Sequence, residues 1–208
     1  MILQNYKIRF LFKIILIINN KMNKKLCFIY TETTGLHKYG GEVSKKKLDC
    51  FARLVKLNYE IGYIEDKQYF LDKEVSHIIK PRCMYIPDET IKYHGITNEI
   101  AKEKGVEIED VIKEFIEDVK DIDIIISHNI DFHLRTILAE IIRYNIYFDI
   151  SKYIILDTIS FSHNYGFIKL KDLAQKVGIK EINETNENNT ELIRNVFFKL
   201  YNKYKKSI

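Results

Sequence analysis

Two short segments of the chain hold side chains whose types and spacing could do chemistry. Glu32 follows an apolar run at residues 26–30 and opens a Thr/Gly loop, and Asp131 and His133 lie two residues apart in HNIDFH. Hard divalent cations bind several oxygen ligands, and a neutral imidazole can also ligate a metal. If these groups converge on one point, they suit hydrolysis assisted by one or two bound cations.

Each of these residues also has an ordinary structural role. Glu32 could be a polar residue at a strand end, and His133 a hydrogen-bonded imidazole on a helix face. Asp131 stands where a helix is expected to begin, so it could cap that helix. Tyr30, two residues before Glu32, is most simply an aromatic side chain that fills the core or a cleft. The choice depends on the fold.

Hydrophobic periodicity predicts the elements that position these residues. Runs rich in β-branched and aromatic residues indicate strands at 26–30, 52–63, 68–80, 122–127 and 153–157. Amphipathic spacing, with Asp88 as a cap and Gly95 as a stop, indicates helices at 88–94, 97–104, 107–120, 131–146, 169–177 and 189–204. The largely apolar run at 122–127 (IDIIIS) suits a central parallel strand. This order predicts one α/β domain with a mixed sheet flanked by helices.

Five segments, in the same order and spacing, resemble the DnaQ-like (DEDDh, ribonuclease H-like) 3′→5′ exonuclease family. Residues 28–36 (FIYTETTGL) look like the first motif, FxDxETTGL, and residues 126–140 (ISHNIDFHLRTILAE) look like the second, HNxxFDxxfL. The remaining similar segments are 80–97, which ends in HGIT, then 156–160 with 170–179, and the final helix, at the place of the third motif, HxxxxD. The resemblance covers about residues 26–202 and implies a ribonuclease H-like fold with a central mixed five-stranded sheet and helices on both faces.

The same resemblance implies that most of the family's catalytic side chains are replaced here. In the family, two acidic residues of the first motif and one Asp from each of the other two hold the cations, and a third-motif His is the general base. At the matching positions this chain has Tyr30, Glu32, His133, Asn189 and, for the His, Glu184. Only Glu32 keeps its type, and a phenol with a pKa of about 10 cannot bridge cations as a carboxylate does. We therefore expect a pseudo-exonuclease with no cofactor.

Two other interpretations stay open. A live exonuclease could use an altered site made of Glu32, Asp131, His133 and a loop glutamate, either Glu184 or Glu187, with Mg²⁺ or Mn²⁺ as the cofactor. In that case Glu32 and Asp131 are the expected metal ligands. Alternatively, the fold could serve only as a scaffold for a protein partner.

Nucleic-acid binding is expected to outlast the loss of catalysis. In the family the TTGL loop packs against the 3′-terminal nucleotide, and this chain keeps Thr33, Thr34, Gly35 and Leu36, together with His128 and Asn129 of the second motif. A formal net charge of +4 permits a polyanionic partner without demanding one. The resemblance therefore implies single-stranded DNA or RNA as the ligand, and the sequence does not discriminate between them.

Composition sets the context. Three widely spaced cysteines, Cys27, Cys50 and Cys83, argue against a disulfide framework or a zinc site and for a reducing cytoplasmic or nuclear compartment rather than secretion. The bias toward Ile, Lys, Asn and Tyr suggests an AT-rich genome, such as that of a large DNA virus or an AT-rich protist. The apolar run at 8–18 is too short to span a membrane. It could be a signal-peptide core, but Asn19, Asn20 and Lys21 follow it and there is no small-residue cleavage site. Translation could instead start at Met22, so we expect an extension at 1–21 and an exonuclease-like domain at 22–208.

Overall fold

The fold is built on a mixed β-sheet, as expected from the sequence. The computed structural model describes residues 24–66, 68–82, 84–161, 167–180 and 189–205. Within them the five strands lie in the order β3-β2-β1-β4-β5. Their bounds are β1 Lys24–Thr33, β2 Leu54–Glu65, β3 Gln68–Ile78, β4 Ile124–Ser127 and β5 Ile154–Asp157. The pairs β1–β2 and β2–β3 are antiparallel, whereas β1–β4 and β4–β5 are parallel.

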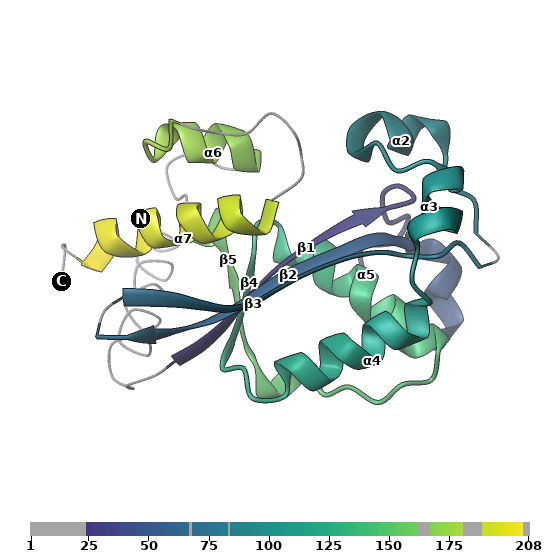
Figure 1. The fold of residues 1–208 in the computed structure, drawn as a ribbon, viewed down its shortest axis with the longest axis horizontal. Helices are drawn as coiled ribbons and strands as arrows, with labels where there is room; N and C mark the ends of the chain where they lie inside the picture. Colours follow the sequence, from purple (N-terminus) through teal and green to yellow (C-terminus); the bar gives the residue numbers. More distant parts are fainter. Residues whose placement is uncertain (1–23, 67, 83, 162–166, 181–188, 206–208) are drawn as a thin grey trace.

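Helices cover both faces of this sheet (Figure 1). On one face lie α4 (Ile108–Val119) and α5 (Ile130–Arg143), and on the other lie α6 (Leu170–Lys176) and α7 (Asn189–Lys205). Two shorter helices, α2 (Asp88–His94) and α3 (Asn98–Lys104), stand near the end of the sheet where β1 finishes. Three 3-10 helices complete the described elements: η1 Lys45–Cys50, η2 Ile150–Lys152 and η3 Thr158–Phe161. No helix in these ranges is long and apolar enough to cross a lipid bilayer.

The central strand β1 contributes to two hydrophobic cores because its side chains alternate between the faces. Leu26 and Phe28 pack with α6 and α7, whereas Cys27 and Ile29 pack with α4 and α5. This double burial explains why the strand is apolar at consecutive positions instead of alternating with polar residues.

Several predicted element ends needed correction. Asp88 does not cap α2: Pro87 holds the N-cap position and Asp88 is the first helical residue, although Gly95 ends the helix with a left-handed φ of 72° as expected. The helix expected to reach residue 146 ends at Arg143, and Asn145 just beyond it has a φ of 52°. Asn tolerates that left-handed conformation better than most residues, so the chain can turn there.

A buried ion pair fixes α7 to the sheet. Arg194 donates to Glu60 of β2 over 2.9 Å, and the Glu60 side chain is almost fully buried. The α7 helix therefore has a defined position over β1 and β2. Because β1, β4 and β5 are parallel, the loops after their carboxyl ends meet at one edge of the sheet, where α/β folds commonly bind ligands.

Candidate functional site

An open cleft of about 510 Å³ lies at this edge of the sheet. Its walls come from β1 and the loop after it, from α2, from the start of α5 and from the segment before α6. Most of the residues singled out in the sequence line it: Tyr30, Glu32, Thr33, Gly35, Leu36, His128, Asn129 and His133. Thr34 lines a second pocket instead, and Asn189 is buried at the start of α7 without lining the cleft. Glu184 and Glu187 lie outside the described residues.

His133 is held inside the protein by Thr31. The backbone N–H of Thr31 donates to Nδ1 of His133 over 3.1 Å, and the Thr31 hydroxyl lies 2.8 Å from the same nitrogen. Nδ1 must therefore be unprotonated, and its one lone pair is engaged. Burial lowers the pKa of His133 to about 3, although a hydrogen bond to the His128 backbone opposes the shift. The ring is neutral at pH 7 and presents no free lone pair to a metal.

Tyr30 fills the space beside this imidazole. The two ring centroids are 4.9 Å apart with an interplanar angle of 46°. Burial raises the pKa of Tyr30 above its ordinary value, and the nearby Glu32 raises it further. The phenol therefore stays neutral at physiological pH. The rings of Tyr30 and His133, both uncharged, lie side by side near the end of β1.

Glu32 is half-buried at the floor of the cleft. Burial raises its pKa to about 7, although Lys56 on the neighbouring strand acts in the opposite direction. The carboxyl group is thus close to half-protonated at neutral pH. A hard cation binds the charged carboxylate, so it would have to displace the proton that about half of these groups carry at pH 7.

The family's paired cations do not fit this set of donors. In the part of the chain that the structure describes, no three His, Cys, Asp or Glu side chains converge where a metal ion could be held. The groups at the expected position are a half-protonated carboxyl, a neutral phenol and an imidazole engaged with Thr31. Two cations need several oxygen ligands between them, so these residues alone cannot hold such a pair.

The second-motif segment is positioned by a carboxylate that sequence reasoning did not single out. Asp157, at the end of β5, accepts hydrogen bonds from the backbone N–H groups of Asn129 (2.9 Å) and Ile130 (3.2 Å) at the start of α5. The capping role expected of Asp131 is therefore wrong. Asp131 is exposed, pairs with Arg135 over 2.9 Å and does not line the cleft. The available signal was the LDT segment at 156–158, whose Asp157 is the last residue of the last strand.

His128 ties three parts of the site together. Its Nε2 donates to the Ile168 carbonyl over 2.7 Å, so Nδ1 accepts from the Thr158 hydroxyl over 2.8 Å. Burial lowers the pKa of His128, which keeps the ring neutral. His128 therefore fixes the segment before α6 against the cleft, and both of its ring nitrogens are used internally.

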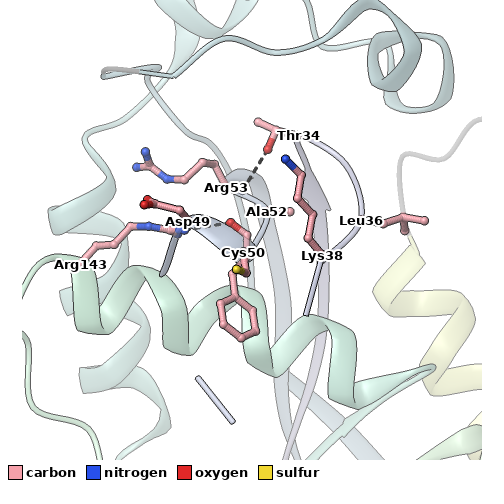
Figure 2. Close-up of a pocket in the computed structure, with 9 residues that line it drawn as sticks. Thr34, Leu36, Lys38, Asp49, Cys50, Ala52, Arg53 and Arg143 are labelled. Carbon is pink, nitrogen blue, oxygen red and sulfur yellow. Dashed lines mark hydrogen bonds between the residues drawn. The ribbon is translucent and has the colours of Figure 1, made fainter. Parts of the chain in front are cut away.

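Hydrogen bonds anchor the loop at 33–36, and Leu36 at its end is exposed to solvent. The Thr33 hydroxyl donates to the Gly35 carbonyl over 2.7 Å, and Gly35 has a φ of 144° that favours glycine. Thr34 exchanges two hydrogen bonds of 3.0 Å with the backbone of Arg53, one of them drawn in Figure 2. Leu36 then projects outward with 83% of its side chain exposed.

Exposed apolar side chains gather on the rim of the cleft. Leu36, Tyr93 of α2 (78% exposed) and Phe167, which precedes α6 (77% exposed), all line it, and Lys169 adds a positive charge. These three side chains come from separate parts of the chain, so no single surface helix explains their exposure. Apolar groups that gather around a cavity mark a binding site for a ligand with apolar faces.

Comparison with known proteins supplies the family. The family model RNase_T, described as exonuclease, matches residues 28–184, which is more than half of the chain. With the five-stranded mixed sheet, this match means that the chain belongs to the DnaQ-like 3′→5′ exonuclease family. Among curated proteins no match was found.

Solved exonuclease structures share the fold. Escherichia coli exonuclease I in complex with a dT13 oligonucleotide aligns with a TM-score of 0.68 at 14% identity, covering 88% of this chain and 42% of that chain. Exonuclease I from Methylocaldum szegediense gives 0.64 at 14% identity, covering 88% and 41%. The nuclease domain of 3′hExo, a DEDDh family member bound to rAMP, gives 0.62 at 10% identity, covering 88% and 92%. The chain thus spans about two fifths of the exonuclease I structures.

Proposed function

We propose that this domain binds the 3′ end of a single-stranded nucleic acid in its cleft and does not hydrolyse it. One observation carries the proposal. Neutral Tyr30 and His133 stand beside Glu32, where the family has carboxylates, while the rim of the same cleft remains open. The chemical centre has changed, and the surface that contacts a nucleotide has been kept.

The rim suits an unstacked base. Leu36, Tyr93 and Phe167 offer apolar and aromatic faces around a cleft large enough for a nucleotide. Stacking of a base on an aromatic side chain contributes about 1–3 kcal/mol and tolerates any sequence, because every base has a π face. A base inside a duplex cannot present both faces, so the rim favours single strands. Complexes of exonuclease I with dT13 and dA16 oligonucleotides support a strand as the ligand class.

The neutral floor suits a phosphate without a cation. Two unit charges about 4 Å apart interact by about 4 kcal/mol at an effective dielectric of 20, so each carboxylate near a phosphate opposes binding strongly. Active relatives neutralise their carboxylates with bound cations. Here Tyr30 and His133 are uncharged without a metal, and Glu32 is charged only in part at pH 7. Binding is therefore expected to be independent of divalent cations.

A paired assay tests both halves of this proposal. Fluorescently labelled 12-mers of DNA and RNA are titrated with the protein in EDTA, and the same strands are then incubated with Mg²⁺ or Mn²⁺ to look for shortening. We expect micromolar or tighter binding and intact strands. Tyr93→Ala should weaken binding about tenfold. Tyr147→Ala is the control and should not, because Tyr147 is similarly exposed (83%) but does not line the cleft.

Two results would change the conclusion. Cleavage from the 3′ end that disappears in Glu32→Ala would establish the altered-site exonuclease instead. A lack of binding to every strand, with Tyr93→Ala and Tyr147→Ala indistinguishable from the unmodified protein, would leave the fold as a scaffold for a protein partner.

A further inference from the structure

A second pocket adjoins the cleft on the other side of the loop at 33–36. It has a volume of about 340 Å³, and Leu36 lines both cavities, so the side chain stands between them. Figure 2 shows the charged ends of Arg53, Asp49 and Arg143 on one side of this pocket and that of Lys38 on the other. A strand that leaves the cleft past Leu36 can enter this pocket directly.

A buried carboxylate fixes the guanidinium groups of the pocket in place. Glu140 of α5 is fully buried, and its Oε1 accepts from Arg53 Nε over 2.8 Å and from Arg143 over 2.9 Å. The remaining terminal nitrogen of Arg143 donates to the carbonyls of Leu48 (2.7 Å) and Phe51 (2.9 Å). Groups fixed in this way lose little conformational entropy when a ligand binds them.

The charge of the pocket matches one phosphodiester. Arg53, Arg143 and Lys38 supply three positive charges, and Glu140 and Asp49 supply two negative charges, which leaves one positive charge. Lys38 is exposed. Among the residues that the structure describes, no hydrogen bond or ion pair engages its ammonium group. Arg53 keeps a quarter of its side chain exposed although its Nε is used. Arg53 also hydrogen-bonds the Tyr144 side chain, so its exposed part and the free Lys38 ammonium are the groups that remain for a ligand. An exposed part of a guanidinium beside an ammonium is a usual protein site for a phosphate.

We propose that this pocket is a phosphate subsite for the nucleotide on the 5′ side of the 3′-terminal one, so that the strand bends over Leu36 with its terminal base in the cleft. The inference rests on the proposed function, because it places the continuation of the same strand. The competing interpretation is that Arg53, Glu140 and Arg143 only join β2 to α5. That structural role predicts no effect of the two exposed pocket residues, Lys38 and Asp49, on a ligand.

The test therefore uses those two exposed residues. Lys38→Ala and Asp49→Asn change one charge each without altering the core, and Lys46→Ala is the matched control, because Lys46 is exposed on η1 and does not line the pocket. Each protein is titrated with a labelled thymidylate 12-mer at several salt concentrations. Thymidine 5′-monophosphate, which is short enough to occupy only the cleft, is titrated separately by NMR.

The two charge-changing substitutions at the pocket should alter binding of the 12-mer but not of the mononucleotide. We expect Lys38→Ala to weaken it about three- to tenfold and to reduce the slope of log affinity against log salt by about 0.7, the value for one phosphate of a single strand. Asp49→Asn should tighten it about two- to fivefold because a repulsive charge is removed. The mononucleotide should bind all four proteins equally. A structural role of the arginine cluster moves none of these quantities.

The failures can be told apart. If the 12-mer binds and Tyr93→Ala weakens it, but Lys38→Ala and Asp49→Asn match Lys46→Ala, the subsite is overturned and the proposed function stands. Equal losses in Lys38→Ala and Lys46→Ala indicate a diffuse surface charge and also overturn the subsite. If the unmodified protein binds neither ligand, the proposed function fails and the subsite fails with it.

Discussion

Nδ1 of His133 accepts a hydrogen bond from the backbone N–H of Thr31, which joins the first turn of α5 to the end of β1. Both residues are buried, and the contact spans 102 positions of sequence. A carboxylate at position 133 could accept the same hydrogen bond, but it would bring a charge into this buried space, where an unpaired charge is costly. The imidazole keeps the contact between helix and strand without a charge.

The pH dependence of stability should report this buried imidazole. The pKa of His133 falls from 6.5 to about 3 on folding, so between these values the unfolded chain binds a proton that the native protein does not. Its contribution is complete above pH 6.5 and is lost as the pH falls toward 3, by at most about 1.4 kcal/mol per pH unit. His133→Asn keeps an acceptor for Thr31 and removes the titration. Urea unfolding from pH 4 to 8 should show a smaller acid loss in the variant.

Glu32 should impose the opposite dependence. Its pKa rises from 4.5 to about 7 on folding, so the native protein holds a proton that the unfolded chain releases between these values. The associated stability is complete below pH 4.5 and is lost as the pH rises through 7. Glu32→Gln should therefore match the unmodified protein at pH 4 and exceed it at pH 8, by on the order of 1–3 kcal/mol. Equal unfolding free energies at pH 8 would contradict the burial of this carboxyl.

The sheet and its helices were predictable because each element has a complete local signal. The run at 122–127 holds three consecutive isoleucines, Ile124–Ile126, because β4 is covered on both faces, and the stripe in 107–120 matches the buried face of α4. Helix ends were less predictable because they depend on distant partners. The carboxylate at the start of α5 is Asp157, from a strand 27 or 28 positions away, whereas local sequence pointed to Asp131.

The sequence predicted which residues come together in the candidate site better than it predicted their hydrogen bonds and exposure. Motif spacing placed Tyr30, Glu32 and His133 together, and all three line the cleft. Spacing could not indicate that His133 Nδ1 is engaged by Thr31, because that contact depends on the angle between α5 and β1. It also missed Tyr93 and Phe167, which are ordinary aromatic residues until the fold exposes both on one rim.

Carboxylates placed at positions 30 and 133 should destabilise the domain and give little strand cleavage. Tyr30→Asp with His133→Asp removes two packed rings and puts two negative groups beside Glu32. Loss of the aromatic packing alone costs about 3–5 kcal/mol per large side chain. We expect a lower melting temperature in EDTA, partial recovery with millimolar Mn²⁺, and little cleavage of a labelled strand, since metal ligands also need surrounding groups that orient them. Rapid Mn²⁺-dependent cleavage by this variant would show that the rest of the site is intact.

Glu140 should be important for stability although it lies outside the cleft. One buried carboxylate serves Arg53, Arg143 and the backbone N–H of Leu54, so Glu140→Gln leaves two guanidinium groups without their counter-ion. Breaking a buried pair in this way typically costs about 3–5 kcal/mol. Glu117→Gln is the control, because the Glu117–Lys120 pair is exposed and such pairs contribute about 0–1 kcal/mol. Chemical unfolding of the three proteins should separate the variants clearly.

Metal removal and one charge on the rim test the ligand site together. Binding of a single-stranded 12-mer should be the same in EDTA and in Mg²⁺, because Tyr30 and His133 are neutral without a cation.

Leu36→Asp should weaken binding of the same 12-mer by tenfold or more, since it places a charge against the terminal base. The fold should be unaffected, because 83% of Leu36 is exposed. Leu71→Asp is the matched control, as Leu71 is about half exposed on β3 and does not line the cleft. Fluorescence anisotropy gives the affinities, and circular dichroism verifies the fold of each variant. Binding that requires Mg²⁺, or equal losses in the two leucine variants, would contradict a metal-independent site at this rim.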